Sequence, residues 1–326
     1  MTDVLSEVLA VTRLKGTVYF SAELRAPWGV ALPQRPRSPF YAVTQGRCEI
    51  ALAGTRSSGV SLDPGDLVVL PGGSAHTLAS SPDAAAIPLE QFVARYPMDE
   101  RGHLEALDGQ GATTFLIGGF FELERAPEPL VSILPPMLHL PGDDIELSGW
   151  LGPTLAAIAH EAAQALPGRA VVLNRLADVL FVRVVRASLL KMSAADGAGP
   201  PSWLRGLSDP RIARALAQIH HAPEQAWTLA QLSSGAAMSR TAFAQRFRAL
   251  VGQTPVCYLA TWRMQKAAYL LEMGTLSIKQ IAERVGYASE LAFAKAFRRL
   301  IGMPPGVYAR RHTRGQENLH GSPGQA

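Results

Sequence analysis

The stretch TLAQLSSGAAMSRTAFAQRFRALVGQTPVCYL, from Thr228 to Leu259, is followed by a second version of itself, SIKQIAERVGYASELAFAKAFRRLIGMPPGVYA, from Ser277 to Ala309. The two copies keep the same residue types at the same spacing, so they predict one local structure that is built twice. The matched positions are Phe243 with Phe293, Phe247 with Phe297, Gly252 with Gly302, Pro255 with Pro305, and Tyr258 with Tyr308.

Each copy begins with the signature of a short helix. Capping boxes, in which a hydroxyl and an amide three residues later satisfy each other's backbone donors, are predicted at Thr228 with Gln231 and at Ser277 with Gln280. The first helices should cover roughly residues 229–236 and 278–285. Gly286 suits a left-handed residue that ends such a helix, whereas Ala237 at the equivalent place would cost about 1 kcal/mol.

A second helix follows in each copy, capped by Ser239 in the first and by Ala288 or Ser289 in the second. One face of each helix is apolar at a spacing of about 100° per residue and is expected to be buried: Phe243, Phe247 and Leu250, or Phe293, Phe297 and Leu300. The opposite face has short side chains at its centre and basic ones along one edge. Such a face can enter the major groove of a duplex while its long side chains reach base edges and phosphates.

A third helix is expected between the copies. Thr254 and Pro255 read as a cap and a first-turn proline, and the apolar spacing continues to about Leu271. A rigid connector of this kind would hold the two basic helices about one turn of DNA apart, roughly 34 Å.

These motifs resemble the DNA-binding domain of the AraC/XylS family of transcription regulators. The resemblance covers about the last third of the chain and rests on Trp262-Arg263-Met264, Ile281-Ala282-x-x-Val285-Gly286-Tyr287 and Gly302-x-x-Pro305. It implies duplex DNA as one partner of the protein and RNA polymerase as another. The residues expected to contact DNA are Ser239, Arg240, Thr241, Gln245, Arg246, Arg248, Ser289, Leu291, Lys295, Arg298 and Arg299.

Composition and charge agree with two domains of different function. The chain has 326 residues and a net charge of +4. From Trp203 onward there are 16 Lys and Arg against 6 Asp and Glu, so the basic charge is concentrated in the C-terminal third. Cys48 and Cys257 belong to no metal-binding spacing and are expected to be buried thiols of a cytoplasmic protein. No window resembles a signal peptide or a membrane span.

The N-terminal part begins with a helix-like pattern at residues 3–14 and continues as short apolar runs separated by Gly and Pro. This spacing is typical of an antiparallel barrel or sandwich, between which the sequence alone does not decide. The turn at Pro64-Gly65-Asp66, the strand after it and His76 resemble the second half of a cupin motif. Together with the segments APWGVALP and LPPMLHL, they resemble the cupin-type sensor domain of many AraC-like regulators, which implies a cupin-like barrel.

The candidate effector-binding residues are Trp28, Tyr41, His76 and His139. In related sensor domains a histidine and a cysteine stand where this chain has Tyr41 and Gly118. Two histidines are too few for a closed zinc site, so neither a metal nor another cofactor is expected. The histidines could instead donate to a small polar ligand or be ordinary core and surface residues, and Trp28 could wall the same pocket or simply pack.

The apolar spacing becomes helical between Leu147 and Met192. Its wide stripe must be covered by the barrel, by a partner helix or by a second copy of the chain, so a homodimer is one expectation. Residues 193–201 read as a linker, and Asp209-Pro210 should cap a helix that ends near His221. His220 and His221 then favour the dipole of that helix, and the tail after Thr313 should be disordered.

The sequence therefore predicts an α+β protein of two domains, with a cupin-like antiparallel β-barrel and helical connector followed by an all-α double helix-turn-helix. The expected ranges are 1–145 for the effector-sensing domain, 146–192 for the connector, 193–202 for the linker, 203–312 for the DNA-binding domain and 313–326 for the tail. The predicted function is transcription regulation in response to a small molecule, without enzymatic activity. The alternatives are a metal-dependent cupin enzyme fused to a DNA-binding domain, and an architectural DNA binder without a ligand.

Overall fold

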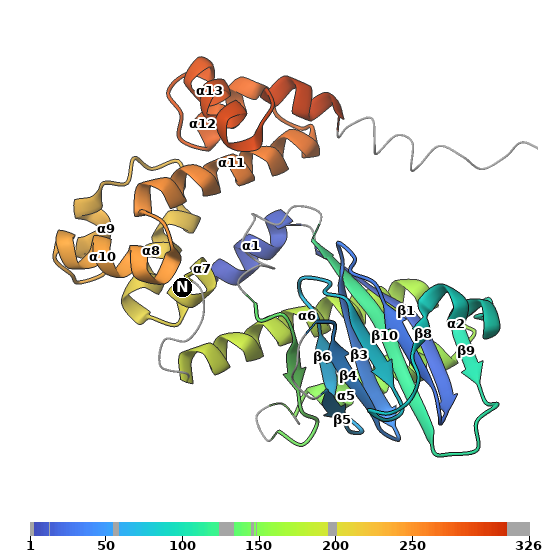
Figure 1. The fold of residues 1–326 in the computed structure, drawn as a ribbon. Helices are drawn as coiled ribbons and strands as arrows, with labels where there is room; N and C mark the ends of the chain where they lie inside the picture. Colours follow the sequence, from blue (N-terminus) through green and yellow to red (C-terminus); the bar gives the residue numbers. More distant parts are fainter. Residues whose placement is uncertain are drawn as a thin grey trace, which may run out of the picture. The chain divides into compact units, whose positions relative to one another are not determined.

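The computed structural model describes residues 3–12, 14–54, 59–123, 134–144, 147, 149–194 and 201–311. Its backbone contacts divide the chain into two units (Figure 1). One unit is Arg13–Ala195, and the other combines Met1–Thr12 with Asp196–Ala326. The expected tail and most of the expected linker lie outside the described residues.

The unit Arg13–Ala195 contains two mixed β-sheets with a hydrophobic core between them. The six-stranded sheet has the order β11-β6-β3-β10-β1-β9, and the five-stranded sheet has the order β5-β4-β7-β2-β8. The strands are β1 (Leu14–Arg25), β2 (Gly29–Leu32), β3 (Ser38–Gln45), β4 (Cys48–Leu52), β5 (Val60–Leu62), β6 (Leu67–Val69), β7 (His76–Ala79), β8 (Ile87–Pro88), β9 (His103–Ala106), β10 (Thr113–Leu123) and β11 (Leu138–Leu140).

The expectation of a single antiparallel barrel is wrong in two respects. The described strands form two separate sheets, and β9 and β8 pair in parallel with β1 and β2. Both parallel strands are only a few residues long. β8 leads into α2 (Leu89–Arg95) and β9 follows it, so the chain crosses from the five-stranded sheet to the six-stranded sheet around this helix.

A bulge in β1 alters the direction of its aromatic side chains. Val18 is opposite Gly119 and Phe20 is opposite Gly118, so Tyr19 is an extra residue between them. Bulges of this kind redirect side chains at the edges of sites. Here both Tyr19 and Phe20 line the cavity between the two sheets.

Helices α5 (Leu151–Ala163) and α6 (Arg169–Ala194) cover the outer face of the six-stranded sheet (Figure 1). The rings of Phe121 and Phe181 lie 5.0 Å apart in this layer. The predicted inward stripe is buried at Leu151, Leu155, Ile158, Ala162, Leu173, Leu180 and Val184, whereas Leu176 is half-buried and Val179 is exposed.

Helix α1 (Val4–Thr12) belongs to the unit that contains the C-terminal helices. It packs against α8 (Pro210–His221) and α11 (Pro255–Met273), and its buried residues are Val4, Leu5, Val8 and Val11. The range 1–145 expected for the sensor therefore differs from the observed unit at its start. A short amphipathic helix shows in sequence which face is apolar but not which partner covers it.

The remaining helices of this unit are α7 (Trp203–Leu207), α9 (Leu229–Gly235), α10 (Arg240–Val251), α12 (Ile278–Arg284) and α13 (Glu290–Ile301). Both predicted capping boxes are present, at Thr228 with Gln231 and at Ser277 with Gln280. The caps at Asp209, Ser239 and Thr254 are confirmed, and of the two candidates for α13 the cap is Ser289.

The turns between the paired helices have the expected left-handed residue. Ala237 has a φ of 52° and Gly286 has a φ of 81°. The next backbone N–H returns to the preceding helix in both pairs, from Met238 to Ser233 and from Tyr287 to Ala282, at 2.9 Å. The phenylalanines of α10 and α13 are fully buried as predicted, but Leu250 is half-buried and Leu300 is 42% exposed.

The described helices include none that is long and apolar enough to cross a lipid bilayer.

Candidate nucleic-acid interface and cavity

Helices α10 and α13 have matching frames. The hydroxyl of Ser239 accepts the N–H of Ala242 at 3.3 Å, and the hydroxyl of Ser289 accepts the N–H of Ala292 at 3.2 Å. Each helix ends at a left-handed glycine, Gly252 or Gly302. Because the phenylalanines fix one face of each helix in the core, the opposite face is held outward.

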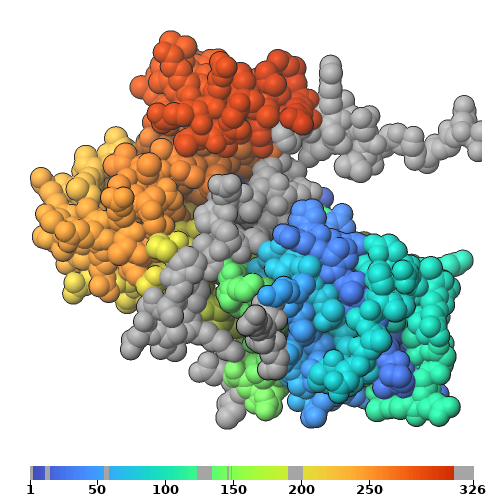
Figure 2. Space-filling model, in the orientation of Figure 1, coloured from blue at the N-terminus to red at the C-terminus, as the bar shows by residue number. Residues whose placement is uncertain are grey.

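The side chains predicted to contact DNA all lie on the outward faces of these two helices. They are exposed at Ser239, Arg240, Thr241, Gln245, Arg246 and Arg248 in the first pair and at Ser289, Leu291, Lys295, Arg298 and Arg299 in the second. The surface of the helices from α10 to α13 runs from orange to red in Figure 2.

Most of the basic groups on these faces have free charges. Within the described parts of the chain, none of the following forms an ion pair: Arg240, Arg248, Lys295, Arg298 and Arg299. Arg246 differs, because its Nε is bound by a carboxylate oxygen of Asp209. Unpaired cations on exposed helices can neutralise phosphates without first breaking an internal ion pair.

Arg263 ties the two helix pairs to the connecting helix α11. Its Nε donates to the carbonyl of Pro223 at 2.6 Å, and its Nη2 donates to the carbonyl of Gln225 at 3.0 Å. The same guanidinium lies 5.7 Å from the ring of Tyr287. One side chain therefore contacts the loop that enters the first pair and the turn of the second.

The turn at Gly286 packs closely against the same loop and against the guanidinium of Arg263. A Cβ at that position would lie 2.5 Å from the carbonyl oxygen of Glu224 and 2.6 Å from Nη2 of Arg263. The family motif identified Arg263 by resemblance. Its role in joining the two pairs depends on carbonyls about 40 residues away, which no local pattern reveals.

His220 is a buried member of the core of this unit. Its Nε2 lies 2.7 Å from the hydroxyl of Tyr258, and its ring lies 4.0 Å from that of Trp262. Burial, with a smaller contribution from the charge of Lys266, lowers the pKa of His220 to about 3. The expectation that His220 acts as a cation at the end of its helix is therefore wrong, and only His221 is exposed there.

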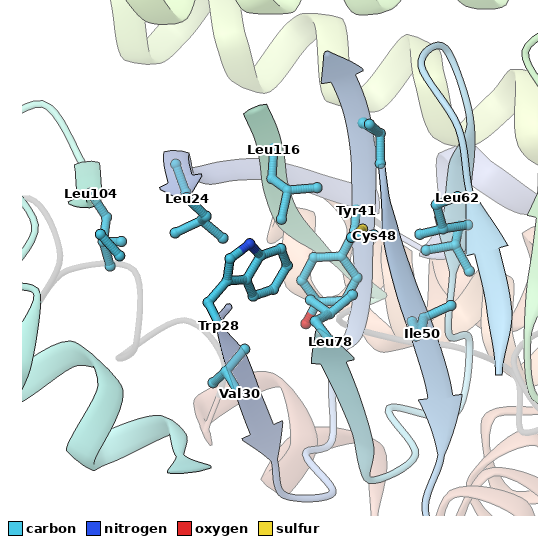
Figure 3. Close-up of a cluster of buried hydrophobic side chains, with 14 of the residues drawn as sticks. Leu24, Trp28, Val30, Tyr41, Cys48, Ile50, Leu62, Leu78, Leu104 and Leu116 are labelled. Atoms are coloured by element: carbon cyan, nitrogen blue, oxygen red, sulfur yellow. The ribbon is translucent and has the colours of Figure 1, made fainter. Parts of the chain in front are cut away.

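The unit Arg13–Ala195 contains a cavity of about 460 Å³ between its two sheets. Apolar and aromatic side chains line most of it, with Arg35, Arg37 and Glu90 at exposed positions on its wall. Of the candidate effector-binding residues, Trp28, Tyr41 and His76 line this cavity. Figure 3 shows Trp28 and Tyr41 side by side among the leucines of the core.

Tyr41 and His76 form a buried neutral pair. The Nδ1 of His76 lies 2.7 Å from the carbonyl of Ser74, so this nitrogen carries the proton and donates it. Burial lowers the pKa of His76, although the bond to Ser74 opposes this, and the imidazole stays neutral. Its Nε2 is therefore an acceptor, and the Tyr41 hydroxyl donates to it at 2.9 Å. Burial also raises the pKa of Tyr41 far above its ordinary range.

His139 lies apart from the cavity. Its Nε2 is 2.8 Å from the carboxylate of Asp66, whose other oxygen accepts the N–H of Gly142 at 2.8 Å. The structure thus brings His76 together with Tyr41 but does not bring His139 to them. Among the described residues that line the cavity, His76 is therefore without a second histidine.

The position of Gly118 is filled by a neighbouring ring. A Cβ on Gly118 would lie 2.1 Å from the ring of Phe20, so Phe20 occupies the space that a larger side chain would need. Among the described residues, the side chains that approach one another as metal ligands could are Glu23, His103 and Glu105, whose ligand atoms lie within 4.8 Å. They lie on β1 and β9 and do not line the cavity.

The two cysteines differ in environment. Cys48 is buried in the core, where burial and the nearby charges of Asp66 and Glu49 raise the pKa of its thiol to about 12. Cys257 is exposed at the start of α11, so the expectation of two buried thiols is wrong for this residue. Its place on the helix is on the side away from the apolar stripe.

Comparison with known proteins identifies a different family model in each part of the chain. A family model described as cupin matches residues 3–189, and one described as a helix-turn-helix domain matches residues 232–311. The fold and the exposed basic helices thus define a DNA-binding transcription regulator with a cupin-type N-terminal domain.

The chain is similar over nearly its whole length to known regulators of this class. It is 37% identical to an AraC-like transcription regulator of Streptomyces lividans and 38% identical to one of Streptomyces antibioticus, over 95% of this chain and 99% of each relative. It is also 29% identical to the regulator AlkR of Acinetobacter baylyi, over 94% of this chain and 98% of that one. The chain belongs to the AraC family of transcription regulators, and these relatives are regulators rather than enzymes.

Proposed function

We propose that this regulator binds duplex DNA with both helix pairs, α9–α10 and α12–α13, acting as two helix-turn-helix units. The observation that carries the proposal is the equivalence of α10 and α13, which have the same cap, the same buried phenylalanines and free cations on their outward faces. The two helices would then occupy successive turns of the major groove.

The contacts within each groove divide by position. Gln245 and Arg248 in α10, and Lys295 and Arg298 in α13, are the residues proposed to reach base edges or the rim of the groove. Arg240 and Arg299 are proposed to meet phosphates, and the remaining exposed members of the set, Ser239, Thr241, Ser289 and Leu291, lie beside them. Arg246 shares its charge with Asp209 and is proposed to contribute less to phosphate binding.

A small molecule in the cavity is proposed to be the effector. The cavity is of the size that proteins use for such ligands, and Trp28, Tyr41 and His76 line it. A ligand can change DNA binding only through a difference in its affinity for the two states of the regulator. His139, held by Asp66, is proposed to have no direct contact with the effector.

Further partners and the domain limits are proposed from the same features. The exposed side chains of Val171, Val172 and Val179 on α6 support a homodimer through that helix. RNA polymerase as a partner and a cytoplasmic location follow from the proposed role in transcription. The effector-sensing domain is proposed to end near residue 145, the connector near 192 and the DNA-binding domain near 312.

A nuclease footprint with the full-length protein tests the proposal. The DNA is the promoter region beside the protein's own gene, with and without an extract of cell metabolites. Protection of two sites about one helical turn apart, changed in extent by the extract, is the expected result. Protection that is absent or independent of DNA sequence at low salt would contradict DNA recognition by the two helices.

A further inference from the structure

The inner wall of the cavity has few polar side-chain groups, and most of them already have partners. The Tyr41 hydroxyl donates to His76, and both ring nitrogens of His76 have partners. The indole nitrogen of Trp28 is buried without a partner among the described residues. Figure 3 shows it on the side of the ring that faces Leu24 and Leu116, which both line the cavity.

The inner wall therefore offers few side-chain hydrogen bonds to a ligand. The hydroxyl oxygen of Tyr41 keeps lone pairs that can accept, and Nε1 of Trp28 can donate. A ligand group that needs a counter-charge or several hydrogen bonds would lose its water in this space without full replacement. Such uncompensated burial is strongly unfavourable.

The charged groups at the rim of the cavity do not favour either sign. Arg37 is paired with Glu122 and lies over the ring of Phe120 at 4.4 Å. Arg35 and Glu90 are exposed and, in the part of the chain that the structure describes, form no ion pair. Their opposite charges both lie at exposed positions, where each contributes little, although the charge of Arg35 also acts on Tyr41 and opposes the rise in its pKa.

The rest of the wall is suited to hydrocarbon. Aromatic rings come from the six-stranded sheet, from the residue before β2 and from α2, and they are Tyr19, Phe20, Trp28, Tyr41, Phe92 and Phe120. We propose that the cavity takes an uncharged, predominantly hydrocarbon molecule, which excludes sugars, amino acids and carboxylates as its main ligands. This inference rests on the proposed function, because it names the chemical class of the effector.

Three probes of the same ring system test this class directly: naphthalene, 2-naphthol and 2-naphthoate. Their binding to the full-length protein is measured by equilibrium dialysis, without DNA. Naphthalene and 2-naphthol should bind, and 2-naphthoate should bind at least about tenfold more weakly because its charge would be buried unpaired. Tightest binding by 2-naphthoate, or no binding by the neutral probes, would overturn the proposal.

Two kinds of variant distinguish probe binding inside the cavity from probe binding at its charged rim. Ala22→Leu adds volume to a buried position on the wall and should weaken the binding of both neutral probes by about tenfold. Arg35→Gln and Glu90→Gln change the rim and should alter the binding by less than about threefold. Thermal unfolding of each variant checks that it is folded, and a rim variant that abolishes binding would contradict the proposed location.

The hydrogen bond between Tyr41 and His76 gives a second test. Tyr41→Phe removes the donor and leaves Nε2 of His76 as a free acceptor facing the cavity. The affinity for 2-naphthol relative to naphthalene should then rise by about fivefold, because the probe's hydroxyl can donate to that nitrogen. An unchanged ratio would mean that the neutral probes bind elsewhere.

The binding measurements and the footprint can fail independently. Neutral probes that bind in the cavity but leave the DNA footprint unchanged would support the ligand class and contradict the proposed effector role. A footprint that responds to metabolites, together with no binding of neutral probes, would support the regulator and overturn the ligand class.

Discussion

Asp209 holds Arg246 with one carboxylate oxygen and caps helix α8 with the other. The Oδ2 atom accepts from Nε of Arg246, while Oδ1 accepts the backbone N–H groups of Arg211 at 2.9 Å and Ile212 at 3.1 Å. Arg246 lies on the exposed side of α10, among residues proposed to contact DNA. The same ion pair thus joins α8 to the helix proposed for recognition.

This pair predicts different effects for two arginines of α10. Arg240→Gln should weaken DNA binding and reduce the slope of log affinity against log salt by about 0.9, the value for one phosphate contact. Arg246→Gln should change that slope by less, because Asp209 already neutralises its charge. Salt titrations of both variants on one operator measure this, and a larger loss of slope for Arg246→Gln would contradict the assignment.

The ion pair also predicts a dependence of stability on pH. Burial alone would raise the pKa of Asp209, but the N–H of Ile212, the guanidinium of Arg246 and the N–H of Arg211 together lower it. A carboxylate with a lowered pKa in the folded state stabilises the fold at neutral pH, and this stabilisation is lost as the pH falls through that pKa.

Asp209→Asn keeps the cap and removes the charge, so it isolates the ion pair. We expect a loss of about 0.5–1.5 kcal/mol in the free energy of unfolding at neutral pH, shrinking in acid. Chemical denaturation at several pH values measures it. A loss that is constant down to strong acid would assign the effect to the cap and not to the charge.

The two turns of the repeat provide a matched pair of substitutions. Ala237 has a φ of 52°, which is strained for a residue with a Cβ, whereas Gly286 has a φ of 81° and no space for one. Ala237→Gly should stabilise the protein by about 0.5–1 kcal/mol. Gly286→Ala should destabilise it by more than about 1 kcal/mol, because the backbone strain and the contact with Glu224 add.

Urea unfolding of the two variants beside the wild type gives both values. The opposite signs are the test, since both substitutions exchange the same two amino acids. Destabilisation by Ala237→Gly would show that the lost side-chain contacts outweigh the relief of strain at this turn.

Local signals in the sequence predicted the C-terminal helices well. Caps such as Ser277 with Gln280, turn glycines such as Gly286 and the buried phenylalanines each depend on residues within one or two turns of helix. The repeat tested each signal twice. Boundaries and buried faces followed from these patterns because neighbouring residues determine them.

Features that depend on distant partners were missed. The strand β9 has only four residues, His103–Ala106, too few for a clear alternation, and its parallel pairing with β1 depends on the chain that leads to it. The carboxylate of Asp99 sets its start by accepting the N–H groups of Arg101 and His103 at 2.8 Å. No pattern within β9 itself indicates where the strand starts or that it pairs in parallel with β1.

The cavity shows the same limit. Trp28, Tyr41 and His76 were identified from a resemblance to cupin motifs, and the structure places all three in the wall of one cavity. The bulge at Tyr19 and the ring of Phe20 over Gly118 determine the shape of that wall, and both depend on the register of β1 against β10. Register between strands about 100 residues apart is not encoded in either strand alone.

The burial of His220 predicts a second dependence on pH. Its pKa of about 3 in the folded state lies below the ordinary value of 6.5, so unfolding takes up a proton between these values. As the pH is lowered through this range, the free energy of unfolding should therefore fall by about 1.4 kcal/mol for each pH unit on account of His220.

His220→Gln removes this titration and should flatten the pH dependence by that amount, although it also destabilises the core. His221→Gln, at the exposed neighbouring position, is the matched control. Chemical unfolding from about pH 4 to about pH 7 measures the slopes, with His76 contributing equally to both variants. Equal slopes for the two variants would contradict a neutral, buried His220.

The proposed division of DNA contacts predicts a change in specificity for Gln245 but not for Arg299. Gln245→Ala should relax the preference for one base pair by about 1–3 kcal/mol, because an amide can bond a base edge with two hydrogen bonds. Arg299→Ala should weaken binding to all sequences alike and reduce the salt slope by about 0.9, because a phosphate contact has no sequence preference. Affinities for an operator and its single-base variants, each at several salt concentrations, distinguish the two.

Because both side chains are exposed on short helices with buried anchors, neither variant should change the fold. Equal losses on operator and random DNA for both variants would mean that α10 does not read bases through Gln245.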